Sequence, residues 1–84
     1  MTDRVTTPQY SDKQGQYLAF IYYYGKLNRQ APSEADMQRY FEVTAPTVHQ
    51  MVLTLERLGF ISRAPGAARS IQLLLEADQL PHLK

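Results

Sequence analysis

Cysteine is absent from the sequence. This absence excludes disulfide bonds, thiolate metal sites and thiol nucleophiles, and it leaves the redox compartment open. Long apolar runs are also lacking, because the most apolar stretch, YLAFIYYYG, is far shorter than the roughly 20 residues that a membrane-spanning helix needs. No signal-peptide pattern flanks this stretch. We therefore expect a cytoplasmic protein that does not interact with a membrane.

Neither sign of charge dominates the sequence. Nine Lys and Arg residues oppose eight Asp and Glu residues, so the formal net charge is +1. A field this weak neither demands nor excludes a nucleic acid as partner, and the distribution of charge has to decide. A chain of 84 residues predicts one small domain. Such a domain buries roughly 60–65% of its unfolded surface and leaves little room for an enclosed active site.

The first ten residues, MTDRVTTPQY, show no helical period and contain a proline, which predicts a flexible N-terminal arm over residues 1–10. Ser11 suits a helix N-cap. The apolar residues that follow repeat on one helical face. They predict a first helix over residues 12–25, where Gly25 begins to close it, or as far as Leu27.

A second, short helix is predicted over residues 34–41. Ser33 suits its N-cap, and Asp36 stands three residues later, at the position of the acid in a capping box. The segment EVTAP that follows is too brief for anything except a tight turn. This turn leads into a third helix, for which Thr44 suits the N-cap and Pro46 the first turn.

The third helix is predicted over residues 45–58, and Gly59 is a natural stop. One face is apolar at spacings of four and three residues, formed by Val48, Val52 and Leu55. Three further apolar residues lie off that face: Met51, Leu53 and Leu58. Two interpretations of them stay open. Either the helix is broadly buried and they belong to the core, or they form a patch for self-association or for a partner.

After the third helix, two β-type runs, FISR and SIQLLL, flank the turn APGAAR, which predicts a β-hairpin over residues 60–74. The tail over residues 76–84 is poorly constrained. Three helices with a short turn between the second and the third, followed by a hairpin, describe a mainly α fold with a small β-hairpin. The predicted architecture is therefore a three-helix winged helix-turn-helix domain over residues 11–75.

The outer face of the third helix carries neutral hydrogen-bonding groups where lysines and glutamates are usual. A recognition helix must present groups that bond to base edges in the major groove of DNA. Four side chains of this kind occur: Thr47, His49, Gln50 and Thr54. The alternative for His49 is an ordinary surface histidine. A metal-binding or catalytic role lacks companions, because the other histidine of the sequence, His82, lies in the tail.

Three arginines accompany this face, Arg57 near the end of the third helix and Arg63 and Arg69 on the two limbs of the hairpin. Between Thr44 and Ile71 they stand against one acid, so this segment has a net charge of +2. Phosphate contacts from all three would give a log–log salt slope of roughly −3. The alternative for the two hairpin arginines is that they are ordinary surface charges.

Other chemistry has little support. The three consecutive tyrosines at residues 22–24 point in three directions on a helix. This favours packing of their rings in the protein with the hydroxyls exposed to water, and it disfavours a flat platform on which nucleobases stack. Ser33 is explained more simply as a cap than as a nucleophile, and no serine has an evident His–Asp pair. The sequence predicts no enzyme activity, no metal site, no cofactor and no small-molecule ligand.

Several segments together resemble the DNA-binding domain of LexA-type repressors. APSEADM, TVH, TLERLGFISR and ARSIQL are similar to family segments in which T-V-H opens the recognition helix and an R-x-I-x-L strand returns from the wing. The resemblance runs from about Ser11 to Leu74 and is strongest from Thr47 to Leu73. It implies a winged-helix fold that binds duplex DNA through the third helix.

Carried over by position, the resemblance implies base contacts from Thr47, His49 and Gln50, with Thr44 and Pro46 close to the DNA backbone. Two features differ from the family pattern. The family has one further residue between the proline and T-V-H, and it has a glycine where this chain has Glu42. The family also continues into a self-cleaving serine–lysine peptidase domain that dimerises it. No such segment occurs in these 84 residues, so we expect no peptidase activity.

The leading interpretation is a sequence-specific, double-stranded-DNA-binding protein, a small transcriptional regulator that acts as a homodimer. Its recognition helix covers residues 45–58 and its wing covers residues 60–74. The alternative is a winged-helix module for protein–protein interaction with little or no specific DNA binding, which the low net charge favours. The candidate DNA-binding residues are Ser33, Thr44, Pro46, Thr47, His49, Gln50, Thr54, Arg57, Arg63 and Arg69.

Overall fold

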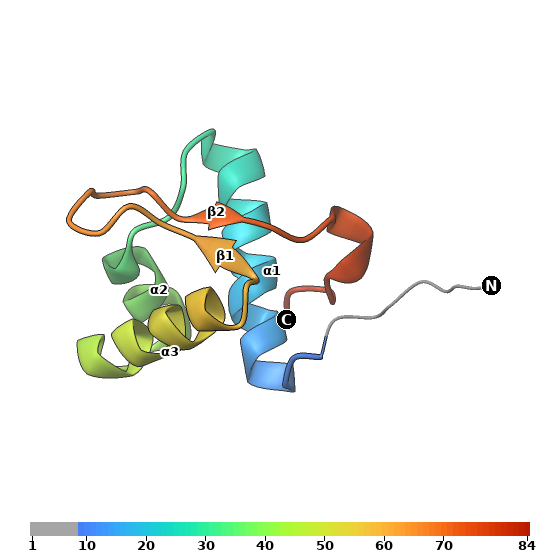
Figure 1. Cartoon of the computed structure of the whole chain (residues 1–84), viewed down its shortest axis with the longest axis horizontal. Coiled ribbons are helices and arrows are strands. Elements are labelled where there is room, and N and C mark those ends of the chain that lie inside the picture. The colour runs from blue at the N-terminus through green and yellow to red at the C-terminus, as the bar shows by residue number, and fades with distance from the viewer. Residues whose placement is uncertain (1–8) are drawn as a thin grey trace.

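The computed structural model of the chain describes residues 9–84. Figure 1 shows α2 and α3 on one side of α1, with the loop of the β-hairpin reaching out on that same side. Three helices followed by a two-stranded antiparallel hairpin confirm the predicted winged helix-turn-helix class. The elements, in chain order, are α1 (Asp12–Asn28), α2 (Glu34–Phe41), α3 (Ala45–Arg57), β1 (Ile61–Ser62), β2 (Gln72–Leu73) and the 3-10 turn η1 (Ala77–Gln79).

Each of the three α-helices begins at a hydroxyl side chain that accepts a hydrogen bond from the first turn of that helix. These N-caps are the predicted ones: Ser11, Ser33 and Thr44. Such caps satisfy backbone N–H groups that have no partner within the helix. Because this chemistry is local, α2 covers the predicted residues, and α3 ends one residue before the predicted position, at Arg57.

Helix α1 is longer than predicted, because it continues through Gly25 to Asn28. A glycine inside a helix costs about 1 kcal/mol relative to alanine but does not by itself end the helix. The helix ends where Arg29 adopts a left-handed conformation with φ of 57° and donates its backbone N–H to the carbonyl of Gly25 at 2.9 Å. The side chain of Asn28 donates to the carbonyl of Tyr24 at 3.0 Å and strengthens this last turn.

The core gathers apolar side chains from every α-helix and from the hairpin. Helix α3 contributes the face that the sequence predicts, and Met51 packs partly buried beside it. Leu58 is 41% exposed, so it does not join the core. Neighbouring rings of the tyrosine run are not parallel, since Tyr22 and Tyr23 meet at 77°. The fully or nearly buried apolar residues are Tyr17, Leu18, Ala19, Phe20, Ile21, Met37, Val48, Val52, Leu55, Phe60, Ile61 and Ile71.

The hairpin is very short. Its two strands pair in the register Ile61 with Leu73 and Ser62 with Gln72, and each strand has two residues. The hydroxyl of Ser70 closes the loop beyond them, because it accepts from the backbone N–H of Ala64 and donates to its carbonyl. Because the strands form so few backbone hydrogen bonds with each other, the direction of the loop depends on the side chains that bind it to the rest of the protein.

The tail packs beside the N-terminal half of α1. The hydroxyl of Tyr10 donates to the carbonyl of Gln79, and the side-chain amide of Gln16 donates to the carbonyl of His82 at 2.9 Å. Leu80 and Leu83 pack against the core. The boundary between a domain over 11–75 and a tail over 76–84 stays a prediction. Most of the predicted N-terminal arm lies outside the described residues.

None of the helices in residues 9–84 combines the length and the apolar character that crossing a membrane requires.

Burial assigns different roles to two leucines of the α3 region, which gives a test of the inner face. Replacement of the fully buried Leu55 by alanine should lower the free energy of unfolding by about 2–5 kcal/mol. The matched control, Leu58→Ala, removes the same atoms from an exposed site and should cost less than about 1 kcal/mol. Urea denaturation followed by circular dichroism measures both. Equal losses would contradict the assignment of the inner face.

Candidate nucleic-acid interface

Helix α3 turns its predicted outer face to solvent. Pro46, Thr47, His49 and Gln50 are exposed, whereas Val48, Val52 and Leu55 are buried on the opposite face. Thr54 is half-buried, and its hydroxyl donates to the backbone carbonyl of Gln50 at 2.9 Å. Threonine in a helix often bonds to the preceding turn in this way. The hydroxyl of Thr54 is therefore already engaged within the helix.

The N-terminus of α3 is electrostatically different from those of α1 and α2. The first turn of α1 contains one acid and that of α2 contains two, whereas the first turn of α3 contains none. The helix dipole and the unpaired backbone N–H groups of a first turn favour an anion. Thr44 caps the helix, and its hydroxyl lies 2.9 Å from that of Thr47. This end of α3 is therefore suited to approach a phosphate backbone.

His49 is held by an acid from another helix. Its Nδ1 lies 3.2 Å from both carboxylate oxygens of Glu34, at the start of α2. The two side chains are 52% and 38% exposed, and they form an ion pair only when the imidazole is protonated. Because Nδ1 faces Glu34, Nε2 is the ring nitrogen that is left for another partner. Glu34 is not among the predicted site residues, because it lies 15 residues from His49 on a different helix.

Two polar side chains of α3 keep their hydrogen-bonding capacity. Within residues 9–84, the side-chain amide of Gln50 has no hydrogen-bond partner, and the guanidinium of Arg57 has no acidic partner. Both residues are exposed. An amide offers a donor and an acceptor together, and a guanidinium offers five N–H donors. Gln50 and Arg57 are thus the side chains of α3 that are most available to a partner.

Arg63 is braced against the end of α3. Its Nε donates to the carboxylate of Glu56 at 3.0 Å, and the arginine side chain is only 18% exposed. This pair links the first limb of the hairpin to α3. The predicted phosphate contact of Arg63 would have to use the guanidinium nitrogens that Glu56 does not occupy.

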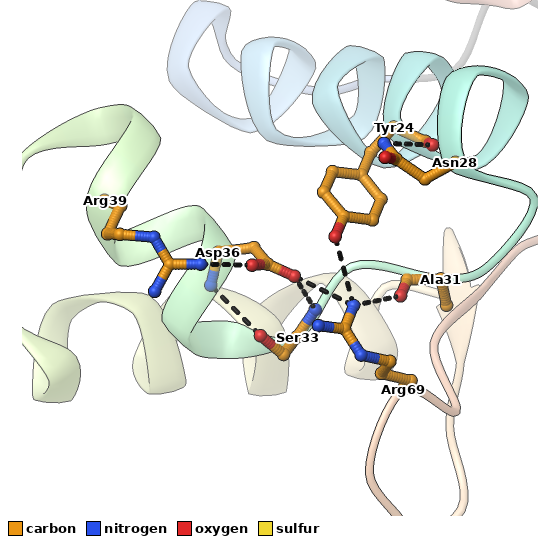
Figure 2. Close-up of polar contacts among 7 residues, drawn as sticks. All are labelled: Tyr24, Asn28, Ala31, Ser33, Asp36, Arg39 and Arg69. Atoms are coloured by element: carbon orange, nitrogen blue, oxygen red, sulfur yellow. Dashed lines mark hydrogen bonds and ion pairs between the residues drawn. The ribbon is translucent and has the colours of Figure 1, made fainter.

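Arg69 is engaged by other parts of the protein, and its predicted phosphate contact on the wing stays a prediction. Figure 2 shows its guanidinium turned toward the connection between α1 and α2. Nη1 lies 2.9 Å from a carboxylate oxygen of Asp36, 3.0 Å from the carbonyl of Ala31 and 3.2 Å from the hydroxyl of Tyr24. The acid attracts the arginine because it is buried, with 7% of its surface exposed. These contacts direct the guanidinium inward.

Asp36 also completes the cap of α2. Its carboxylate accepts the backbone N–H of Ser33 at 2.9 Å, and the hydroxyl of Ser33 accepts the backbone N–H of Asp36 at 3.1 Å. Chiefly because of the bond from the Ser33 backbone, with smaller help from neighbours that include Arg69, the pKa of Asp36 is lowered from 3.8 to about 2, although burial opposes the change. Ser33 is thus occupied as a cap.

A groove of about 440 Å³ lies between the start of α2 and the wing. Its lining includes Glu34, His49, Arg63, Gly66 and Ala68, so it adjoins the outer face of α3. In this groove Glu34 lies beside His49, and Arg63 is paired with Glu56. Within residues 9–84, no group of three or more His, Asp or Glu side chains is arranged to hold a metal ion. The arrangement can contact a polar, anionic surface.

Two LexA repressors are similar to this chain. The one from Thermosipho melanesiensis is 34% identical over 70 residues, which cover 83% of this chain and 35% of that relative. The one from Thermosipho africanus is 38% identical over 64 residues, which cover 76% of this chain and 32% of that relative. The chain therefore spans about a third of the length of these curated relatives. The resemblance to LexA repressors is thereby confirmed over most of the chain. No family model matches the chain.

The pKa of Asp36 predicts a specific sensitivity of the fold to acid. Because the folded pKa of about 2 lies below the usual 3.8, the carboxylate stabilises the fold fully above about pH 5 and loses this effect as the pH falls toward 2. The difference corresponds to roughly 2 kcal/mol. Urea denaturation between pH 7 and pH 2 should show this loss in the wild type.

Asp36→Asn should be less stable at pH 7 and should lack that part of the acid dependence. Asp78→Asn, which changes an exposed acid in η1, is the matched control and should retain the wild-type dependence. Parallel stability curves for the wild type and Asp36→Asn would show that this carboxylate does not carry the effect.

Proposed function

We propose that this protein binds double-stranded DNA in a sequence-specific manner and acts as a transcriptional regulator. The observation that carries the proposal is the exposed outer face of α3, which presents Gln50 and His49 on a winged helix-turn-helix fold. The relatives are named LexA repressors, which supports a regulatory role, and specifically repression, over an enzymatic one. Because the chain spans about a third of those relatives, the proposal concerns DNA binding by this segment.

In the proposed complex, the N-terminal half of α3 enters the major groove. The Gln50 amide donates to and accepts from one base edge, the arrangement that suits adenine. Nε2 of His49 and the methyl group of Thr47 lie on the same exposed face and contact neighbouring bases. Each good base contact contributes about 1–3 kcal/mol of discrimination. Three such positions specify a short half-site.

The phosphate contacts come chiefly from Arg57 and from the acid-free N-terminus of α3. Arg63 and Arg69 contribute less than their charges suggest, because Glu56 and Asp36 already pair with them. We therefore expect a log–log salt slope of roughly −1 to −2 per protomer in place of −3. Three base positions give one protomer little specificity, and so few phosphate contacts give it little affinity. We therefore propose that two protomers bind adjacent half-sites as a homodimer.

The second candidate function is a protein-interaction module, and two observations favour it. Intramolecular ion pairs occupy both wing arginines, and the apolar Leu58 and Leu74 are 41% and 55% exposed. A protein of this kind would bind DNA weakly, without preference for sequence, and would release it at physiological salt.

Selection of duplexes from a random library at about 0.15 M salt, the physiological range, separates the two functions. Specific binding predicts enrichment of one motif, and two copies at a fixed spacing would indicate a dimer. A folded protein that enriches no motif would support the interaction module. Sedimentation of the free protein and of its complex with the selected duplex then gives the number of protomers.

Gln50→Ala should weaken binding to the selected motif by about 1–3 kcal/mol and relax the preference at one base pair. The matched control is Gln30→Ala, which removes an exposed amide from the connection between α1 and α2. It should leave both affinity and preference unchanged. If both variants bind as the wild type does, Gln50 does not read DNA.

A further inference from the structure

Side-chain anchors hold the wing of this protein, because its two-residue strands form few ladder bonds. Ser70 closes the loop on itself, and Arg63 reaches α3. Arg69 alone among these anchors reaches α1 and the start of α2, through Tyr24 and Asp36. The position of the loop relative to the helices therefore depends heavily on Arg69.

The backbone of Arg69 indicates that this contact is imposed by the tertiary structure. Its φ is 55°, in the left-handed region that residues other than glycine rarely adopt. Strain of this kind persists only where the surroundings over-determine the conformation. Here three acceptors from distant parts of the chain bind the same Nη1 (Figure 2). Arg69 therefore combines a left-handed backbone conformation with a guanidinium that binds groups of the helices and their connection.

The other end of this contact belongs to the helix-turn-helix itself. Asp36 accepts from the backbone of Ser33 at the start of α2, and Arg39 also donates to its carboxylate. Helix α2 in turn packs against α3. A buried carboxylate needs a paired charge. The same pair that neutralises Asp36 therefore ties the wing to the frame that carries the recognition helix.

We propose that Arg69 and Asp36 form a pin that sets the position of the wing relative to α3, so that Arg69 is a positioning residue for DNA binding and does not contact phosphate. This inference rests on the proposed function. A phosphate contact would draw the guanidinium away from Asp36 and leave a buried carboxylate without this partner, which is unfavourable.

The two roles of Arg69 predict opposite effects for Asp36→Asn. This change makes the protein more positive and releases Arg69. If Arg69 binds phosphate, the variant should bind the selected duplex more tightly. If the pin is correct, the variant should bind about tenfold more weakly, a typical size for coupled neighbours. Tighter binding by a folded Asp36→Asn variant would overturn the inference.

Arg69→Gln tests the pin while the cap of α2 stays intact, and it is decisive if Asp36→Asn fails to fold. The pin predicts weaker binding with an unchanged salt slope, whereas loss of a phosphate ligand should reduce the slope by about 0.9. Arg57→Ala is the control that should reduce it. The double variant Asp36→Asn with Arg69→Gln should bind no more weakly than Asp36→Asn alone, because once Asp36 is changed the contact that Arg69→Gln removes is already broken.

A measurement without DNA separates failure of this inference from failure of the proposed function. In ¹⁵N relaxation experiments, Arg69→Gln should increase the mobility of residues 64–68, while the amides of α1 and α3 keep their wild-type order. If the wild type binds no DNA but the loop loosens as expected, the pin stands and the proposed function fails. If the loop keeps its wild-type order in Arg69→Gln, the pin is wrong whatever the DNA results are.

Discussion

A carboxylate that leaves water must find its partners inside the protein, and Asp36 has three, two of them in α2 and its cap and one on the wing. The backbone of Ser33 donates to it from the start of α2, Arg39 donates from the next turn, and Arg69 donates from the wing. Local capping explains why an acid stands at this position, and burial explains why it also draws in an arginine from 33 residues away. Arg69 also donates to the hydroxyl of Tyr24, so the start of α2, the wing and the last turns of α1 meet around this ion pair (Figure 2).

The same pairing changes how the surface charge should be interpreted. Counted along the chain, the segment with α3 and the wing has a net positive charge, yet acids hold Arg63 and Arg69. His49 has an acid beside it as well. A cation that is already paired gains less from a phosphate than an exposed, unpaired one, so the electrostatic attraction to DNA is smaller than the composition suggests. What remains is a short face on α3 whose chemistry suits base contacts better than a general attraction to polyanions.

The similarity to LexA repressors and the physical description of the fold agree where they overlap. Both concern most of this chain and about a third of the relatives. The relatives add a regulatory context, whereas the structure adds the partners of individual side chains. The structure is needed beside the sequence similarity, because the similarity does not reveal that Arg69, a predicted phosphate ligand, binds Asp36.

The sequence by itself determined the features that depend on neighbours in the chain. The caps at Ser33 and Thr44, the bounds of α2 and the buried face of α3 follow from side-chain types at fixed local spacings. The end of α1 was predicted too early, because a glycine weakens a helix without ending it. Only the tertiary structure decided which charges meet. Glu34 with His49 and Asp36 with Arg69 lie 15 and 33 residues apart, and packing of α2 against α3 and the wing brings them together. Ion pairing depends on distance in space and on burial, and a sequence read alone contains neither.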